Sequence, residues 1–259
     1  MRFPRSCLLF LSGLLLFAVT ACAPRSTLVE RPKLLTLDQW ASMLQNRTEQ
    51  WRTYEAKLTI RARSDKGKFR FRTVVLAKLP DQFRLEAINP WGQTIGLLLL
   101  RGDQAELWVP SEKTLYTADH PEVLVAHFLG IPVHLETLGY SLTGSIPPEM
   151  LASLRGVPGK PRWLEYEGGS ESKRTLVWKF ASPSNALEAV DVREASWNYT
   201  ITYEPSVDLE SAGLPRRIRI ASQQWEMDIT VDQIAPSPPV DDSSFNPPIP
   251  SGLRLIRLS

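Results

Sequence analysis

Few side chains in this chain of 259 residues have the type and spacing needed for metal chemistry. The three histidines, His120, His127 and His134, are spaced seven residues apart, but Gly130 and Pro132 interrupt any helix joining them. Helical metal sites place two histidines four residues apart, as in HExxH, a motif that is missing from this sequence. The pattern favours helix caps and surface positions for these histidines, and we expect no metal site.

Two serines lie in sequences that resemble nucleophile motifs. Ser141, in GYSLTG, lacks the second glycine of GxSxG and the strand-turn-helix setting that exposes such a serine. Ser170 and Lys173 match SxxK, but they follow two glycines between expected strands, which is typical of a solvated hairpin loop. Asp241 and Asp242 lie in a proline-rich tail that favours a turn. With no glycine-rich phosphate loop either, we expect no enzyme activity and no cofactor.

The N-terminus has the pattern of a secretory signal. Arg2 and Arg5 precede an apolar run from Cys7 to Ala21. At 1.5 Å per residue, these 15 residues span about 22 Å of helix, which is less than the roughly 30 Å of a bilayer core. A short apolar run after basic residues predicts a signal peptide over residues 1–21 rather than a membrane-spanning helix.

The residues before Cys22, Val19-Thr20-Ala21, are typical of a bacterial lipobox, whose cysteine is diacylated and becomes the N-terminus. We therefore predict lipidation at Cys22 and stable anchoring by its acyl chains. The alternative is an ordinary signal peptide with a chance cysteine. Cys7 would leave with the signal, so the mature chain would have no thiol for a disulfide.

The residue after Cys22 indicates in which membrane the protein is anchored, and the charge balance indicates which partners are unsuited to it. Ala23 replaces the aspartate that often marks inner-membrane retention in enterobacteria, which favours the periplasmic side of the outer membrane. Arg2 and Arg5 account for the formal net charge of +2, so residues 22–259 carry 28 basic and 28 acidic side chains. A neutral chain argues against nucleic-acid binding, which usually needs a basic excess.

The chain after the expected tether at residues 22–35 predicts one mainly β domain over residues 36–259. Thr36 and Gln39 have the spacing of a capping box and begin a helix of some 15 residues. Apolar and polar residues then alternate through 55–63, 68–78 and 83–87, which indicates an antiparallel meander with one solvated face. About ten or eleven strands are expected in total. Further short helices are expected at 121–129, 135–142 and 148–155.

One face of the expected sheet is strongly apolar, and the first helix could cover it. Periodicity alone favours a packed core, but barrels of eight or more strands can also enclose a ligand cavity. The candidate cavity residues are Trp40, Met43, Leu44, Leu58, Ile60, Phe69, Phe71, Val75, Phe83, Leu85, Leu97, Leu99, Leu124 and Phe128.

The segment from Arg84 to Pro148 resembles the LolB family of outer-membrane lipoproteins. The matching text is INPWGQT at 88–94, LYTADH at 115–120 and HFLGIPVHLETL at 127–138. The resemblance implies an unclosed antiparallel β-barrel with a helical lid that encloses a hydrophobic cavity for acyl chains. In that family the NPxG loop projects an apolar residue, often leucine, that helps deliver cargo to the membrane. The matching residue here is Trp91.

The function implied by this resemblance is that of a monomeric, membrane-anchored receptor. It would accept acylated lipoproteins from a LolA-like periplasmic carrier and insert them into the outer membrane. Two alternatives stay open: a lipid- or glycolipid-binding lipoprotein of the same fold, and an envelope scaffold whose apolar face is packed core.

Overall fold

The computed structural model describes residues 34–102, 104–168, 174–182, 184–194, 197–205, 213–237 and 240–259. The predicted signal peptide, Cys22 and the SxxK motif at Ser170 lie outside these residues, as does the predicted tether up to residue 33. Residues Leu34–Ser259 form one compact unit. Among the helices described, none is both long and apolar enough to cross a bilayer.

The first described helix, α2 (Leu37–Gln50), begins at the predicted capping box. The Thr36 hydroxyl accepts a hydrogen bond from the Gln39 backbone N–H at 3.3 Å. The Gln39 side chain accepts one from the Thr36 N–H at 3.0 Å. These two bonds satisfy N–H groups that the first helical turn leaves without partners. The capping-box prediction is therefore confirmed.

The described strands form a single sheet of fourteen, rather than ten or eleven. The first six are β1 (Thr53–Ser64), β2 (Gly67–Lys78), β3 (Gln82–Ile88), β4 (Thr94–Arg101), β5 (Gln104–Val109) and β6 (Thr114–Ala118). The next four are β7 (Arg155–Val157), β8 (Lys160–Gly168), β9 (Arg174–Phe180) and β10 (Leu187–Arg193). The last four are β11 (Asn198–Pro205), β12 (Pro215–Ala221), β13 (Glu226–Pro236) and β14 (Arg254–Leu258). β7 was not predicted: the helix expected at 148–155 ends at Leu151, and Arg155 begins this strand, whose three residues are too few to show an alternating pattern.

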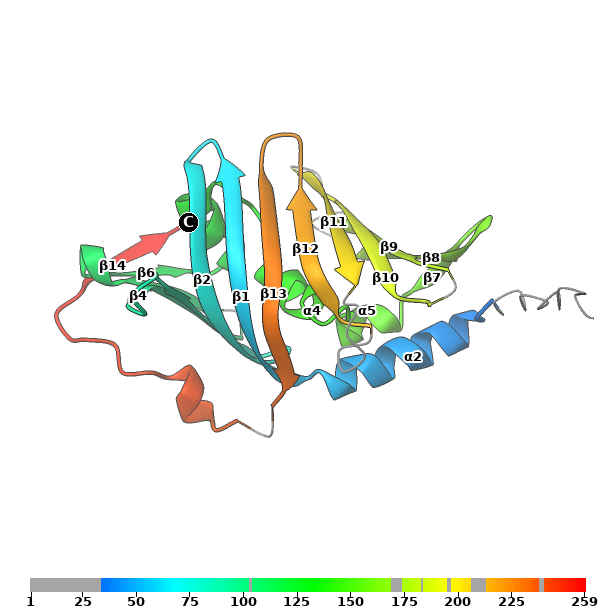
Figure 1. The fold of residues 1–259 in the computed structure, drawn as a ribbon, viewed down its shortest axis with the longest axis horizontal. Helices are drawn as coiled ribbons and strands as arrows, with labels where there is room; N and C mark the ends of the chain where they lie inside the picture. Colours follow the sequence, from blue (N-terminus) through cyan, green and yellow to red (C-terminus); the bar gives the residue numbers. More distant parts are fainter. Residues whose placement is uncertain are drawn as a thin grey trace, which may run out of the picture. The chain divides into compact units, whose positions relative to one another are not determined.

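The strand order is β14-β6-β5-β4-β3-β2-β1-β13-β12-β11-β10-β9-β8-β7. Neighbours are antiparallel except for β14, which runs parallel to β6. β14 and β7 are the outermost strands of this order, so the sheet is curved but not closed (Figure 1). The prediction of a mainly β fold with an unclosed barrel and helices is confirmed.

Three helices follow β6 in the chain: α3 (Pro121–Leu129), α4 (Leu135–Ser141) and α5 (Pro148–Leu151). The turn η1 (Pro110–Glu112) joins β5 to β6. α3 ends at Gly130, whose φ of +66° suits glycine. A Cβ atom at Gly130 would lie 2.4 Å from Asp65 Oδ1 in the β1–β2 turn. The hydroxyl of Ser64, the last residue of β1 before this turn, donates a hydrogen bond to the Leu129 carbonyl. The end of α3 is thus fastened to the β1–β2 turn.

The C-terminal segment covers part of the outer face of the sheet. Its short helix η3 (Asp242–Phe245) buries Phe245 completely. The Arg84 guanidinium on β3 donates a hydrogen bond to the Ser244 carbonyl at 3.0 Å, and Leu99 of β4 is the register partner of Arg84. This cover explains why four consecutive leucines, Leu97 to Leu100, are all buried although a strand points them alternately to opposite faces.

Candidate functional site: an apolar cavity and an exposed tryptophan

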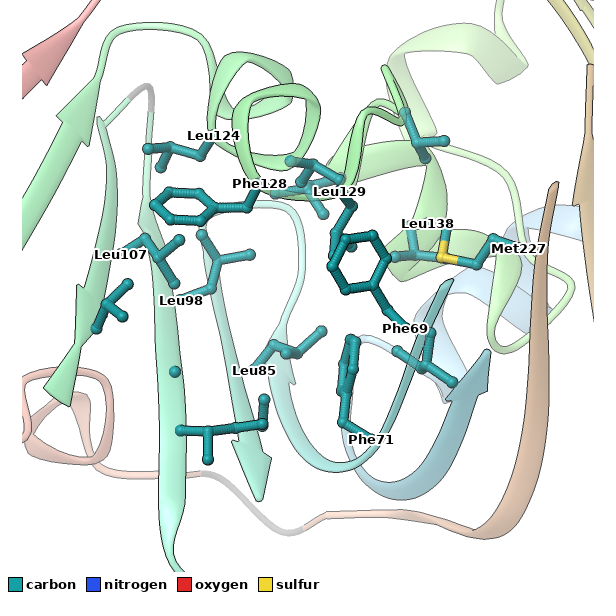
Figure 2. Close-up of a pocket in the computed structure, with 18 of the residues that line it drawn as sticks. Phe69, Phe71, Leu85, Leu98, Leu107, Leu124, Phe128, Leu129, Leu138 and Met227 are labelled. Atoms are coloured by element: carbon teal, nitrogen blue, oxygen red, sulfur yellow. The ribbon is translucent and has the colours of Figure 1, made fainter. Parts of the chain in front are cut away.

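A cavity of about 330 Å³ lies between the inner face of the sheet and α3 (Figure 2). This volume falls in the range of small-ligand sites, roughly 300–1,000 Å³. The strands and η1 contribute Ile60, Phe69, Phe71, Leu85, Ala87, Ile95, Gly96, Leu98, Leu107, Val109, Glu112 and Met227. The helices and the loop between them contribute Leu124, Val125, Phe128, Leu129, Val133, Leu135 and Leu138.

Alternation along β2 places its aromatic side chains in the cavity wall. Phe69 and Phe71 point inward, whereas Lys68, Arg70 and Arg72 are exposed. Figure 2 shows the two phenylalanines on one side of the cavity, with Leu98 and Leu107 on the other side.

Helix α3 closes the cavity from above in Figure 2, through Leu124 and Phe128. The ring of Phe128 meets that of Tyr116 edge to face, with centroids 4.8 Å apart. Such pairs contribute about 0.5–1.5 kcal/mol beyond the area they bury. The lid is therefore held by an aromatic contact at β6 as well as by its fastening to the β1–β2 turn.

Glu112 is the one charged residue in the lining of this cavity. Its carboxylate accepts a hydrogen bond from the Tyr116 hydroxyl, and this bond is the largest cause that raises the pKa of Tyr116. All the other lining residues are apolar or glycine. The site therefore suits a hydrocarbon chain and offers little to a polar ligand.

The structure brings six of the fourteen predicted cavity residues together around this cavity: Ile60, Phe69, Phe71, Leu85, Leu124 and Phe128. Leu58, Val75 and Phe83 point to the interior but are packed in the core outside the lining. Sequence reasoning missed the lining residues of β5 and α4. The register of β3 with β4, which pairs Leu85 with Leu98, shows which leucines face inward.

Five other predicted cavity residues lie elsewhere, which corrects their assignment. Trp40, Met43 and Leu44 belong to α2, where Trp40 packs on Phe180 of β9, with ring centroids 4.4 Å apart. Leu97 and Leu99 point away from the cavity, because alternation directs them opposite to Leu98, toward the face that the C-terminal segment covers. The sequence could not show which half of the sheet α2 would cover.

Trp91 stands out from the β3–β4 hairpin with 83% of its surface exposed. The Asn89 side-chain oxygen accepts hydrogen bonds from the backbone N–H groups of Trp91, at 3.0 Å, and Gln93, at 2.9 Å. Gly92 has a φ of +82°, a conformation that costs glycine little. Hydrogen bonds to Asn89 therefore fix the conformation of the turn, and the large apolar side chain of Trp91 is left in solvent.

Polar groups hold the base of this hairpin. Glu86 on β3 accepts hydrogen bonds from Thr94 on β4 and, at 2.8 Å, from the Arg84 guanidinium. The bond from Thr94 and the nearby Arg84 charge lower the pKa of Glu86. Ile95, beside this base, has no register partner on β3, and it lines the cavity while remaining 43% exposed. The mouth of the cavity therefore lies next to the Trp91 hairpin.

The residues considered for metal or nucleophilic chemistry are held in packing contacts and hydrogen bonds within the fold. His134 is bonded to Glu194 at 2.7 Å, and His127 packs against Phe128. Ser141 is buried in α4. Among the residues that the structure describes, no group of three or more histidine, cysteine or acidic side chains could hold a metal ion.

Comparisons with known proteins agree with this architecture. The fold is similar to a putative outer-membrane lipoprotein-sorting protein domain from Vibrio parahaemolyticus, with 12% identity, a TM-score of 0.53, and coverage of 81% of this chain and 95% of that one. A DUF1329-family protein from Desulfovibrio piger has 10% identity, the same TM-score and the same coverages. A LolA-superfamily protein from Nitrosomonas europaea has 13% identity and a TM-score of 0.47, with coverage of 79% and 96%.

The family comparison is more specific than the structural ones. None of the curated proteins matches the chain. The family model described as outer membrane lipoprotein LolB, however, matches residues 49–233, which include the cavity, its lid and the Trp91 hairpin. The match supports a lipoprotein-binding function. With most of its length matched, the chain belongs to the LolB family of outer-membrane lipoproteins.

Proposed function

We propose that this protein is a membrane-anchored receptor that takes acylated lipoproteins from a LolA-like periplasmic carrier and releases them into the outer membrane. The observation that carries the proposal is the apolar cavity under α3, with its mouth beside the exposed Trp91. Lipidation at Cys22 would hold the mature protein on the periplasmic side of that membrane, where a single copy would act as a monomer.

The cavity can hold acyl chains out of water while they pass from the carrier to the membrane. Each methylene group that leaves water contributes about 0.8 kcal/mol. A wall of leucine, valine and phenylalanine side chains provides that environment, and Glu112, which already accepts a hydrogen bond from Tyr116, is its only charged side chain. The head and the attached protein would therefore stay outside, and only acyl chains would enter.

The transfer we propose involves no covalent step and no cofactor. Acyl chains would pass from the carrier to this cavity because the cavity binds them more tightly, and then to the bilayer because the bilayer binds them more tightly still. Trp91 would act at the second step, since an amphipathic indole ring favours the boundary between headgroups and acyl chains.

The experiment that tests the proposal follows an acylated lipoprotein from a LolA-type carrier to residues 23–259 of this protein, and then to vesicles. Phe71→Glu should abolish acceptance, because it places a charge in the cavity wall. Gly96→Leu should also abolish it by filling the cavity, since a Cβ atom at Gly96 meets no atom closer than 3.8 Å. Val74→Glu is the matched control, because Val74 lies on the same strand as Phe71 and is 40% exposed.

Trp91→Glu should accept cargo normally but deliver it to vesicles slowly. Normal delivery by this variant would remove Trp91 from the mechanism. Acceptance of cargo by folded Phe71→Glu or Gly96→Leu would show that the cavity is not the acyl site. Uptake of a free acyl probe without any acceptance from the carrier would indicate a free-lipid-binding protein instead.

A further inference from the structure

Lys68, Arg70 and Arg72 form a row of exposed basic side chains, here called the basic strip, on the outer face of β2. We propose that the basic strip and Trp91 together form a docking surface for anionic lipid headgroups, which brings the cavity mouth against the membrane. This inference rests on the proposed function and adds to it the class of lipid that the receptor contacts.

The basic strip is joined directly to the cavity wall. In the sequence KFRFR, from Lys68 to Arg72, the two phenylalanines line the cavity and the three basic side chains point the opposite way. One strand segment therefore presents hydrocarbon to the acyl site and positive charge to the outside. A membrane that attracts this strand also approaches the mouth of the cavity.

The same segment lies beside the Trp91 hairpin. Pairing of β2 with β3 starts at Arg72, opposite Ile88, and the hairpin loop begins at the next residue, Asn89. Residues 68–71 of β2 therefore extend past the end of β3. The basic strip and the Trp91 hairpin therefore lie at the same end of the β2–β3 pair.

The basic strip has no charged or hydrogen-bonding side-chain partner within the part of the protein that the structure describes. No described residue forms an ion pair or a side-chain hydrogen bond with any of the three. Arg70 faces Arg61 across the β1–β2 pair, and Lys68 faces Arg63. Like charges placed directly opposite each other destabilise a sheet, so the folded protein tolerates this arrangement at a cost.

Acidic neighbours only partly offset this charge. On β13, Asp228 and Glu226 are the register partners of Arg61 and Arg63, and Glu226 binds Arg63 at 3.3 Å. Both acids lie on the side of β1 away from β2. Asp65 is the only acid in the β1–β2 turn, and the next acid along the chain is Asp81. Positive charge therefore remains on the outer face of β2.

An exposed aromatic ring beside basic side chains fits a membrane surface better than a protein partner. Tryptophan prefers the headgroup level of a bilayer, and lysine and arginine near an anionic surface are attracted to it. This attraction amounts to about a fivefold gain in binding for each basic residue. Loss of all three should therefore weaken binding to anionic vesicles about 100-fold.

The test uses residues 23–259, which lack the acyl anchor but contain the whole compact unit. Binding is measured by flotation with phosphatidylcholine vesicles and with vesicles that also contain phosphatidylglycerol, at low and at high salt. We expect salt-sensitive binding to the anionic vesicles only. Replacement of Lys68, Arg70 and Arg72 by glutamine should abolish this preference. The matched control neutralises Arg52, Lys57 and Arg216, three exposed basic residues away from this hairpin.

Uptake of an acyl probe by the same variants separates this inference from the proposed function. The glutamine variant should take up the probe normally, because its changes lie outside the cavity. Equal loss of vesicle binding in the control would show a general charge effect and overturn the inference. Unchanged vesicle binding combined with loss of transfer from the carrier would assign the basic strip to an acidic protein partner, which also overturns it. Failure of probe uptake in the wild type would refute the proposed function instead.

Discussion

The two halves of the sheet have similar apolar strands, but one half encloses a cavity and the other is packed. In the hollow half, formed by β1 to β6 and α3, side chains enclose about 330 Å³. In the filled half, formed by β8 to β12 with α2 and α5, the pocket between α4, α5 and strands β9 to β11 encloses only about 10 Å³. α4 is the partition, because Leu135 and Leu138 face the cavity while Thr137 and Tyr140 face the filled half.

The halves differ in where their largest side chains point. In the filled half, the indole ring of Trp40 reaches from α2 onto Phe180, and the buried rings of Trp178 and Tyr203 fill the remaining space. In the hollow half, Phe69 and Phe71 stay in the wall, and the covering helix α3 contributes no tryptophan or tyrosine. The helix that covers the hollow half therefore contributes no side chain larger than Phe128, whereas the helix that covers the filled half contributes an indole ring that packs on the sheet.

The largest effect should come from Trp40→Ala, which makes a second cavity in the filled half. Trp40 is only 2% exposed, and removing such a ring costs about 3–5 kcal/mol. Phe71→Ala should cost less, because its side chain already borders empty space and is partly exposed. Denaturant unfolding measures both values, and acyl-probe uptake should survive Trp40→Ala. Loss of uptake by folded Trp40→Ala would show that the two halves are not independent.

A smaller effect is expected from Thr36→Ala, which removes the hydroxyl that caps α2. The expected cost is about 1 kcal/mol of unfolding free energy, because one N–H group of the first turn loses its partner. Since α2 covers only the filled half, acyl-probe uptake should not change. Thr36→Ser, which retains the hydroxyl, should restore most of the stability, and a similar loss in both variants would argue against the cap.

The smallest effect concerns Glu136 on α4, at the edge of the filled half. Partial desolvation of its carboxyl group and the neighbouring Glu149 carboxylate raise its pKa from 4.5 to about 7. The folded state therefore holds more protons than the unfolded state between these values, so this group makes stability fall as the pH rises from about 4.5 to about 7. Glu136→Gln should flatten that part of a pH-stability curve, and a slope identical to the wild type would assign it to other groups.

Local sequence patterns predicted the elements well. Alternation in β2 and β3 correctly put Phe69, Phe71 and Leu85 on one face, and the capping box correctly started α2 at Thr36. These predictions succeeded because strand alternation and helix capping depend on residues that are close in the chain. The exposure of Trp91 also follows from local bonds, those of Asn89 within its own turn.

The same patterns could not assign residues to a cavity. Trp40 and Leu44 were predicted to cover the Phe-lined face, but α2 lies on the filled half, where Arg47 donates a hydrogen bond to the Thr143 carbonyl at 2.8 Å. Leu97 and Leu99 were predicted to line the cavity and Leu98 was not, because a run of four leucines shows no alternation that tells which of them face inward. The segment that covers the face of Leu97 and Leu99 is bonded to β3 through Ser244, which lies almost 150 residues away from them in the sequence.

The sequence alone determined the strand periods, the helix caps, the apolar loop residue and the family, because each is carried by residues that lie near one another in the chain. Only the tertiary structure decided that the inner face is hollow in one half and filled in the other. That outcome depends on which distant helix covers which strands and how large its side chains are. The tertiary structure also revealed that the basic strip of β2 extends past β3 beside the Trp91 hairpin. Strand lengths and register are set by pairing between segments that are distant in the sequence.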